Sequence, residues 1–397
     1  MIKIAILGLG TVGTGVVKVV EANTAPIQHK LGEALGVKTA LVRTMRGGPY
    51  HHLMTENFKE IETDSEIRVV VETIGGVGAA YEYTRRCLMA GKHVVTANKQ
   101  LVAEHGCELL ELARENHVNY LFEASVGGGI PILHPLTQCM AANRVDEIYG
   151  ILNGTTNFIL TKLVKEGASF ADVLKLAQET GYAEADPTAD VEGIDAGRKI
   201  CILADLAFGH QVNPDNVPME GITKLDLKDV EIAGRHGYRI KLLGRCLRLE
   251  GNRRTAYVAP HLIPMDNPNS DVNDVFNAVV VRGNATGEVM FYGKGAGELP
   301  TASACVADVM ECVQENRPRP EIGWSADEGG FVSPLELKDR WYFRVNATAE
   351  QVRQLLDKAT MLEEGRDTVF ITEPITGQDA EALAKKLPVL AHMRVLD

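Results

Sequence analysis

The residues best suited to carry out chemistry lie in one short stretch, GYAEADPTADVEGIDAGRK, which runs from Gly181 to Lys199. The stretch holds five carboxylates and ends on Arg198 and Lys199. Runs of charge are usually solvated and carry no chemistry, so an acidic surface loop is one interpretation. A lysine beside carboxylates can instead donate a proton and stabilise a growing negative charge, which would make the stretch an active site.

The helix that positions this lysine gives a first test of the two interpretations. The pattern predicts a helix from about Asp190 to Phe208, on which Asp195 and Lys199 share a face with the apolar Ile202 and Leu206. An exposed pair at this spacing contributes only about 0.3 to 0.5 kcal/mol, whereas each desolvated charge costs several kcal/mol unless it is compensated. A largely buried helix therefore indicates either a functional pair or a tight structural pair.

A glycine-rich loop stands between a predicted strand and a predicted helix at the N-terminus. The apolar run Ile2 to Leu7 is typical of a buried parallel strand, and GLGTVG follows it directly, before a helix to about Glu21. Glycines let the backbone turn tightly and approach a pyrophosphate, and the helix N-terminus supplies N–H groups to it. The loop therefore predicts a dinucleotide site rather than a merely structural turn. The predicted cofactor contacts in the loop are Gly8, Gly10, Thr11, Val12 and Gly13.

The end of the second predicted strand bears on the choice of coenzyme. This strand covers Val37 to Val42 and is followed by Arg43, where an acidic residue would hydrogen-bond the ribose of NAD. Arginine can pair with the extra phosphate of NADP, so Arg43 favours NADP, with NAD still possible. The alternatives are that Arg43 is one solvated charge, or that Arg46 takes or shares the role.

Three further strands are predicted, at Val69 to Glu72, His93 to Thr96 and Tyr120 to Glu123, and they alternate with helices. This alternation indicates an α/β fold with a doubly wound, Rossmann-type parallel sheet, whose ligands bind beyond the carboxyl ends of its strands. Lys99 lies in that zone, and so do the glycines at 127–129. We expect Lys99 near the nicotinamide and the substrate, in a catalytic or carboxylate-binding role; a solvated lysine is the alternative.

The pattern changes after the first domain, which covers residues 1–131. Longer strands between 132 and 292 suit an inserted α+β domain for the substrate and for dimer formation. The chain is expected to return to the nucleotide domain over about 293–315, where a second glycine loop precedes a helix that begins near Pro300. Gly297 is the predicted cofactor contact in this loop.

Residues 316–339 are rich in proline and glycine and are predicted to be a linker. Residues 340–397 then alternate as strand, helix, strand, helix and strand, with the first helix at Ala349 to Ala359. The order resembles a shortened ACT regulatory domain, but NATAEQV stands where a Pro-Gly turn is usual. Feedback binding of an amino acid is therefore in doubt, and a role in assembly or stability is the alternative.

Composition limits the classes of partner. The 397-residue chain is 45% hydrophobic and has a net charge of -12, which argues against a general nucleic-acid or anionic-membrane role. We expect partners to be small molecules or copies of the chain itself. Seven scattered cysteines without a C-x-x-C pair suit a reducing, cytoplasmic compartment. The N-terminal apolar run is explained by its nucleotide loop rather than by a signal peptide, and no stretch reaches the roughly 18 apolar residues of a membrane helix.

Several motifs occur together and in order: the N-terminal glycine loop, TANK, EASVGGGIPI, NGTTNFIL, GYAEADPTADVEGIDAGRK and YGKGAGELPTASA. Over roughly residues 2 to 315 they resemble the homoserine dehydrogenases. The resemblance implies NAD(P)-dependent interconversion of L-homoserine and L-aspartate 4-semialdehyde in threonine and methionine biosynthesis, by a homodimer or homotetramer. No aspartate-kinase region precedes the glycine loop, which implies the monofunctional form.

The resemblance also assigns roles near the first stretch. It implies that Glu184 and Asp195 hold the amino-acid substrate, that Lys199 gives the proton to the aldehyde oxygen, and that Gly181 contacts the cofactor. An ammonium with a reference pKa near 10.4 needs burial or a second cation to lower its pKa, and Lys99 is a candidate for that cation.

A monovalent cation, expected to be sodium, is implied after the fifth strand. Its ligands in this resemblance are Glu123 and the backbone carbonyls of Val126, Gly128 and Ile130. Glycines allow backbone angles at which carbonyls converge. Spacing alone would favour an ordinary glycine turn that closes the sheet.

Two readings from other classes stay open. Aspartate-semialdehyde dehydrogenase needs a nucleophilic cysteine with a base, but the NGTTN motif has no cysteine, and His134 near Cys139 is too generic a pairing. A non-enzymatic dinucleotide sensor would normally carry a DNA-binding or partner-binding module. The acidic charge disfavours the sensor, and the pair of Asp195 and Lys199 would be left without a role.

Overall fold

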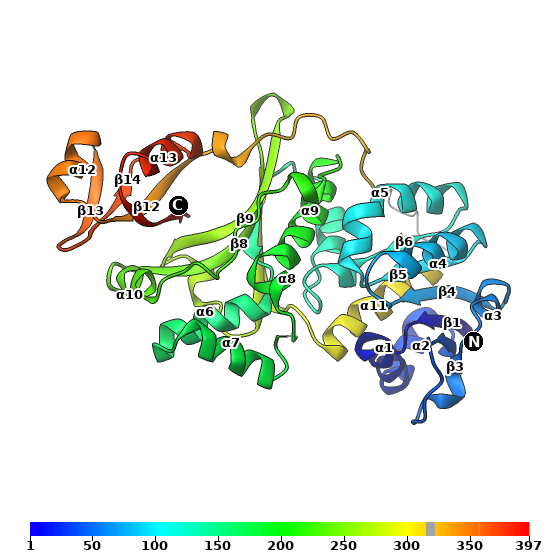
Figure 1. Ribbon diagram of the computed structural model, residues 1–397. Coiled ribbons are helices and arrows are strands. Elements are labelled where there is room, and N and C mark those ends of the chain that lie inside the picture. Colours follow the sequence, from blue (N-terminus) through cyan, green and yellow to red (C-terminus); the bar gives the residue numbers. More distant parts are fainter. Residues whose placement is uncertain (184, 315–321, 357, 397) are drawn as a thin grey trace. The chain divides into compact units, whose positions relative to one another are not determined.

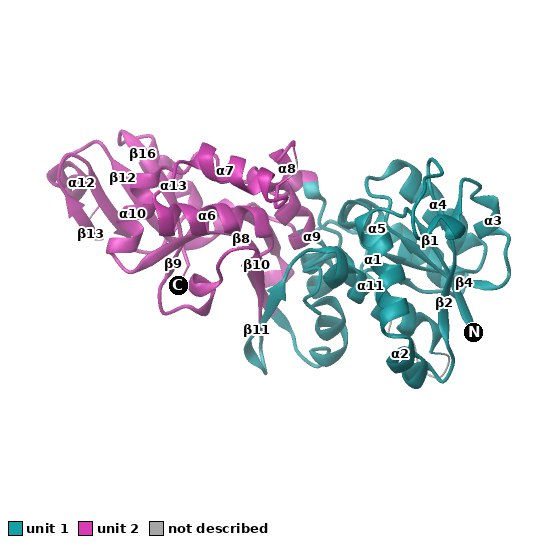
Figure 2. Ribbon diagram, turned by 90° about the horizontal axis from the view of Figure 1, so that it is seen from below, with its two compact units in different colours: residues 1–145, 201–214, 283–329 teal, residues 146–200, 215–282, 330–397 magenta. Residues whose placement is uncertain are grey.

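The computed structural model describes residues 1–183, 185–314, 322–356 and 358–396. They belong to two compact units (Figure 2). Unit 1 comprises residues 1–145, 201–214 and 283–329, and unit 2 comprises residues 146–200, 215–282 and 330–397. Within the described residues, no helix is both long and apolar enough to cross a membrane.

Unit 1 is built on a parallel sheet with the strand order β3-β2-β1-β4-β5-β6 (Figure 1). This is the order of doubly wound dinucleotide-binding folds, and it reverses between β1 and β4, where such folds bind their ligands. The predicted Rossmann-type sheet is therefore confirmed. The strands are β1 (Ile2–Leu7), β2 (Leu35–Leu41), β3 (Met54–Thr55), β4 (Ile67–Glu72), β5 (His93–Thr96) and β6 (Tyr120–Leu121).

The helices of unit 1 cover this sheet, and β1 is buried along almost its whole length, as expected for a central parallel strand. Helices α1 and α11 pack so closely that a Cβ at Gly15 would lie 2.6 Å from the carbonyl oxygen of Glu298. The helices are α1 (Thr11–Ala22), α2 (Thr24–Leu31), α3 (Lys59–Glu62), α4 (Gly78–Met89), α5 (Lys99–Glu115) and α11 (Glu298–Val313). The strand β11 (Gly287–Lys294) precedes α11 in the same unit.

One strand of unit 1 is shorter than predicted. β6 ends at Leu121, and Glu123 instead begins a 3-10 turn, Glu123–Ser125. The backbone N–H of Glu123 donates to the side chain of Asp308 and its carbonyl accepts the N–H of Val126, so neither group is available to a neighbouring strand. The short strand β3 was not predicted, because two residues carry no periodic pattern.

Unit 2 contains a second, mixed sheet in which the order is β10-β7-β8-β9-β16-β12-β14-β13, with β15 paired to β12. β8 pairs antiparallel with β7 and β9, whereas β16 pairs parallel with β9. The strands are β7 (Val145–Ile151), β8 (Tyr238–Arg248), β9 (Arg254–Pro264), β10 (Phe276–Gly283), β12 (Lys338–Val345), β13 (Ala359–Glu364), β14 (Thr368–Thr372), β15 (Ile375–Thr376) and β16 (Val389–Val395).

The helix predicted from Asp190 to Phe208 is two helices, α8 (Thr188–Val191) and α9 (Ile194–Phe208). Gly193 lies between them with φ of 82°, a left-handed conformation that ends the first helix. α9 contributes residues to both units. The other helices of unit 2 are α6 (Gly154–Glu166), α7 (Phe170–Glu179), α10 (Leu227–Arg235), α12 (Ala349–Leu355) and α13 (Gly377–Ala384).

The C-terminal residues follow the order β12, α12, β13, β14, α13 and β16, with the short β15 after β14. Their strands lie in the order β16-β12-β14-β13, which is a βαββαβ arrangement. The helix predicted over Ala349 to Ala359 ends at Leu355, because Ala359 already begins β13. Trp341 and Phe343 of β12 pack in one apolar cluster with residues of α12 and α13, and Tyr342 on the opposite face packs with α10.

Candidate active site

Lys199 lies in a buried cluster of unit 2. Its ammonium nitrogen is 2.7 Å from Oδ2 of Asp195 and donates a second hydrogen bond, of 2.7 Å, to the carbonyl oxygen of Leu152. Both charged residues are buried, with 8% of Lys199 and 4% of Asp195 exposed. The helical spacing therefore predicted their burial correctly. Burying two charges has an unfavourable desolvation free energy, so a buried pair of this kind indicates a functional role or a tight structural pair rather than an incidental contact.

Asn153 joins this cluster, although the sequence did not single it out. Its side-chain oxygen caps α6 by accepting the N–H of Thr156, at 2.8 Å. Its side-chain nitrogen donates to Asp195 at 2.9 Å and to Asp190 at 2.6 Å. One amide therefore brings two carboxylates together. The sequence signal was an Asn in a capping position directly after a strand, in NGTTN.

The turn after α7 is tied to the same helix. The hydroxyl of Thr155 donates to the carbonyl oxygen of Tyr182 at 2.6 Å, and the ring of Tyr182 lies 5.0 Å from that of Phe158. Gly181 is in this turn, where its N–H bonds to the carbonyl of Gln178. Glu184, the other predicted substrate ligand, lies outside the described residues.

The chemistry available to the cluster follows from its charges. Two carboxylates, Asp190 and Asp195, stand near one ammonium, Lys199, and the amide of Asn153 bridges the carboxylates. Such a set can hold a cationic amino group, and the lysine can exchange a proton with a bound oxygen. Groups that can bind an amino group and exchange a proton thus lie in one cluster.

In unit 1 the glycine loop has the geometry of a phosphate-binding turn. Gly8 has φ of 97°, and a Cβ at Gly13 would lie 2.1 Å from the carbonyl oxygen of Gly8, so a larger residue does not fit there. Gly10 is the N-cap of α1 and makes no side-chain cap, and a Cβ on it would meet nothing within 4 Å. The start of α1 at Gly10 therefore adjoins open space, where N–H groups of the first turn can receive a phosphate.

A cavity of about 730 Å³ opens beside this loop. Its lining includes Gly8, Gly10, Arg43, Arg46 and Glu56. The guanidinium of Arg46 donates to the carbonyl of Leu9 and so braces the loop, whereas Arg43 is exposed at the cavity. Glu56, which the sequence analysis did not select, accepts the N–H of Met45 at 2.7 Å. A cavity at the point where the strand order reverses suits a dinucleotide.

Lys99 is the first residue of α5 and lies just beyond β5, as predicted. It is half-buried. The preceding Asn98 caps the helix by accepting the N–H of Leu101 at 3.1 Å and donates to the carbonyl of Gly76 at 2.6 Å. Lys99 belongs to unit 1 and Lys199 to unit 2, and their action on one substrate stays a prediction. Gly297 is the N-cap of α11, and its contact with the cofactor also stays a prediction.

The predicted cation loop is organised by the buried carboxylate of Glu123. It accepts N–H groups from Ile132 at 2.6 Å, Leu133 at 2.9 Å and His134 at 2.6 Å. Burial raises the pKa of Glu123, and these three hydrogen bonds oppose the rise. A Cβ at Gly128 would lie 2.5 Å from the carbonyl oxygen of Gly295, so the turn is packed tightly.

A cation at this loop would depend on carbonyl oxygens. No group of three His, Cys, Asp or Glu side chains that could hold a metal occurs within the described ranges. The predicted ligands, the carbonyls of Val126, Gly128 and Ile130 with Glu123, would be an all-oxygen set, which suits a hard cation rather than zinc or copper.

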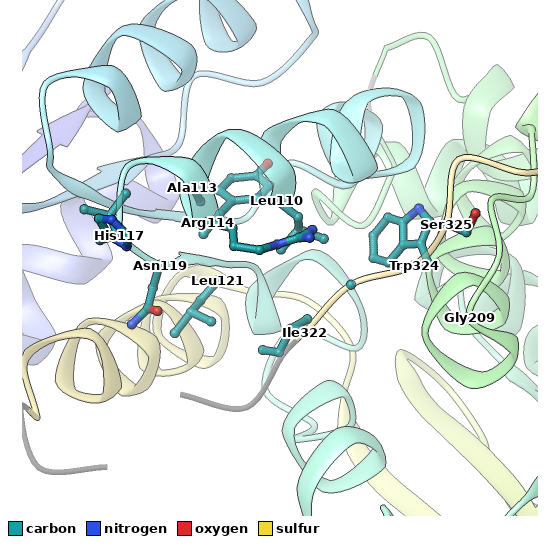
Figure 3. Close-up of a pocket in the computed structure, with 13 residues that line it drawn as sticks. Leu110, Ala113, Arg114, His117, Asn119, Leu121, Gly209, Ile322, Trp324 and Ser325 are labelled. Atoms are coloured by element: carbon teal, nitrogen blue, oxygen red, sulfur yellow. The ribbon is translucent and has the colours of Figure 1, made fainter. Parts of the chain in front are cut away.

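A second cavity in unit 1, of about 580 Å³, shares no lining residue with the first. It lies along β6 and α5, and Arg114 points in the direction of Trp324 across it (Figure 3). The indole N–H of Trp324 donates to Gln211 at 2.8 Å. None of the predicted site residues lines this cavity.

Comparison with known proteins gives a consistent result along the chain. Residues 8–123 match the family model described as the NAD-binding domain of homoserine dehydrogenase, and residues 131–310 match the model of homoserine dehydrogenase. The homoserine dehydrogenase of Bacillus subtilis is 44% identical over 88% of this chain and 82% of its own length. That of Pseudomonas aeruginosa is 41% identical over 100% of this chain and 93% of its own length.

Solved structures agree with the sequence relatives. A homoserine dehydrogenase from Thiobacillus denitrificans has a TM-score of 0.91 at 37% identity and covers 100% of this chain and 98% of its own. A hyperthermophilic archaeal homoserine dehydrogenase in complex with NADPH has a TM-score of 0.68 at 26% identity and covers 80% of this chain and 99% of its own. The chain therefore belongs to the homoserine dehydrogenase family, whose members are oxidoreductases of amino-acid biosynthesis that act on a CH–OH group with a nicotinamide coenzyme.

Proposed function

We propose that this enzyme interconverts L-homoserine and L-aspartate 4-semialdehyde with Lys199 as the group that exchanges a proton with the substrate oxygen. The observation that carries this proposal is the buried ammonium of Lys199, held by Asp195 and the carbonyl of Leu152. When hydride adds to the aldehyde carbon, negative charge grows on the oxygen. A positioned ammonium both stabilises that charge and supplies the proton.

Substrate recognition is assigned to the carboxylates of unit 2. Asp195 and Glu184 hold the substrate ammonium, and Asp190 adds to the negative charge because Asn153 binds it beside Asp195. A cationic substrate group compensates carboxylates that would otherwise repel each other. Lys99 binds the substrate carboxylate or lowers the pKa of Lys199 as a second cation.

For the coenzyme we favour NADP. The strand β2 is not followed by an acidic residue, and Arg43 is exposed at the cavity beside the glycine loop. The archaeal relative in complex with NADPH supports this choice. NAD remains an alternative because Glu56 lines the same cavity and could receive ribose hydroxyls. Residues 1–131 and 293–315 are assigned to the coenzyme, and residues 132–292 to the substrate.

A monovalent cation, sodium in our proposal, would be held by Glu123 and the carbonyls of Val126, Gly128 and Ile130. Its charge would favour the ionised form of Glu123, whose pKa burial raises. The ionised carboxylate accepts the N–H groups of Ile132 to His134. The ion would thereby rigidify the loop that follows the 3-10 turn Glu123–Ser125.

The C-terminal residues are proposed to serve stability and assembly rather than effector binding. The βαββαβ order supports an ACT-like origin for residues 340–397. However, Arg344 is buried and bonds to Asp229 of α10 at 2.7 and 2.9 Å, which fastens the segment to the rest of unit 2. We further propose a cytoplasmic homodimer or homotetramer, on the basis of the family resemblance and the scattered cysteines.

A coenzyme-absorbance assay tests the proposal. L-homoserine should drive reduction of NADP, and more slowly of NAD, while L-aspartate 4-semialdehyde should drive oxidation of NADPH. Coenzyme reduction with the semialdehyde but not with homoserine would instead indicate the acyl-transferring semialdehyde dehydrogenase. A protein that binds NADPH and acts on neither compound would contradict the proposal.

A further inference from the structure

Glu72, the last residue of β4, is a fully buried carboxylate that the reaction as described does not use. Its Oε1 accepts the N–H of Ile74 at 2.6 Å and that of Gly75 at 3.4 Å, and its Oε2 accepts the hydroxyl of Thr96 at 2.6 Å. Burial raises the pKa of Glu72, and these hydrogen bonds oppose the rise. Because burying a carboxylate is unfavourable, its presence at this strand end requires a specific reason.

One end of the Glu72 network supports the coenzyme cavity. Thr73 and Ile74 line that cavity together with the glycine loop. The hydroxyl of Thr73 donates to the carbonyl of Gly8 at 2.7 Å, and a Cβ at Gly8 would lie 3.0 Å from the carbonyl oxygen of Thr73. The turn that Glu72 holds is therefore in direct contact with the glycine loop.

The other end of the network reaches the start of α5. The hydroxyl of Thr96, which donates to Glu72, also accepts the N–H of Asn98 at 2.9 Å. Asn98 in turn donates to the carbonyl of Gly76 and caps α5. The turn after β4 and the helix that begins at Lys99 are thus locked to each other by side-chain hydrogen bonds, all within unit 1.

We propose that Glu72 is a positioning residue which, through Thr96 and Asn98, holds the coenzyme turn and Lys99 in one geometry for hydride transfer. This inference rests on the proposed coenzyme site and on the proposed role of Lys99. Glu72 touches neither the coenzyme nor the substrate and acts only through the backbone that it fixes. Misplacing a reacting group by about 1 Å can lower the rate roughly 100-fold. Correct positioning can therefore offset the unfavourable burial of the Glu72 carboxylate.

Two buried threonines of unit 1 provide a matched test. Thr96→Val keeps the volume of the side chain and removes the link between Glu72 and Asn98. Thr84→Val makes the same change in α4, where the threonine is equally buried and its hydroxyl oxygen has no hydrogen-bond partner. We expect Thr96→Val and Glu72→Gln to lower kcat by about 10-fold or more and Thr84→Val to retain the parental value.

The measurements are kcat and KM for homoserine, the NADPH dissociation constant by fluorescence, the melting temperature, and the kinetic isotope effect with coenzyme deuterated at the transferred position. A positioning role predicts folded Thr96→Val and Glu72→Gln proteins with a larger isotope effect, a weaker NADPH affinity and a kcat loss that exceeds any change in KM. Parental kcat, isotope effect and NADPH affinity in both variants would overturn the inference. So would an activity loss that merely follows the loss of folded protein, with the isotope effect unchanged.

The same measurements separate this inference from the proposed function. If Lys99→Ala retained the parental kcat, the role of Lys99 would fail, yet a raised NADPH dissociation constant in Thr96→Val would still support Glu72 as the residue that fixes the coenzyme turn. If the parent lacked homoserine activity, the NADPH affinity of the variants would decide. An unchanged affinity in both would overturn the inference, and a weaker one would support it.

Discussion

Replacing Lys199 by methionine distinguishes a catalytic lysine from a structural one, and Lys241 offers a matched control in the same unit. Both are buried, with 8% of Lys199 and 3% of Lys241 exposed. Within the described residues each ammonium donates to at least two oxygen atoms; those of Lys241 belong to the side chain of Asn157, at 3.0 Å, and the carbonyl of Val272, at 2.5 Å. The same substitution therefore removes a similar set of contacts at two positions, one of which is assigned to the reaction.

The effect on stability follows from what each methionine leaves behind. Lys199→Met removes the ammonium from the buried carboxylate of Asp195, and breaking a buried ion pair in this way costs about 3 to 5 kcal/mol. We expect about 3 kcal/mol, because Asn153 still donates to that carboxylate. Lys241→Met takes a donor from two neutral oxygens, which costs about 1 to 3 kcal/mol. Both proteins should therefore be destabilised, and unfolding in urea measures by how much.

The effect on catalysis should differ much more. Loss of a proton donor lowers kcat by about 10² to 10⁴, which is about 2.7 to 5.5 kcal/mol in the activation barrier. Lys241→Met should leave kcat per folded enzyme near the parental value, since this side chain contacts neither Asp195 nor Lys199. The assay is semialdehyde reduction followed by coenzyme absorbance, with active sites counted by NADPH titration.

Two results would refute the reasoning. A Lys199→Met protein that folds, binds NADPH and reduces the semialdehyde at the parental kcat would exclude Lys199 as the proton donor. Equal losses of kcat in the two variants, after correction for folded protein, would show that a buried methionine in this unit is harmful in itself.

Three further outcomes are expected. Arg43→Glu should weaken NADPH use and spare or improve NADH use, because a carboxylate repels the extra phosphate and accepts ribose hydroxyls; equal loss with both coenzymes, measured as kcat/KM, would count against Arg43. L-threonine should barely inhibit the enzyme, and strong saturable inhibition that maps to residues 340–397 would contradict a purely structural tail. His261 is buried, and burial lowers its pKa to about 3. As the pH falls below about 6.5, this histidine is therefore protonated in the unfolded protein but stays neutral in the folded protein. This residue should therefore lower the free energy of unfolding by about 2 kcal/mol between pH 7 and pH 5. Over that range the denaturant midpoint of the His261→Gln variant should fall less than that of the parent protein.

The parts of the fold that could be predicted from the sequence are those with strong local patterns. The strand at Ile2–Leu7 and the strand at His93–Thr96 have the predicted bounds, because a continuous apolar run in a parallel sheet needs no distant partner to be recognised. The helix with Asp195 and Lys199 was placed correctly at its buried face. The predicted start of this helix was wrong, because the left-handed backbone conformation of Gly193 separates α8 from α9, and the sequence pattern does not show this break.

The parts that could not be predicted depend on partners far along the chain. Asn153 bonds to Asp195 and Asp190, which are distant in sequence, so no local sequence pattern predicts these hydrogen bonds. Glu123 leaves its predicted strand because its backbone N–H bonds to the side chain of Asp308, far along the chain. The strand β13 was not predicted, and only its first residue, Ala359, fell at the end of a predicted helix, since its partly buried pattern becomes clear only when it pairs with β14.

The strand order of unit 2 bears on how the protein is synthesised. β16 lies between β9 and β12, so the part of β9 at His261 and Leu262 gains its parallel partner only when Arg394 and Val395 have left the ribosome. Unit 1 has the same property, because α1 packs against α11, which begins at Glu298. Neither unit is complete until its last elements have emerged, and the parts of β9 and β12 that pair with β16 lack this partner meanwhile. Because unpaired strand edges of this kind promote aggregation, the topology favours protection of the nascent chain during synthesis.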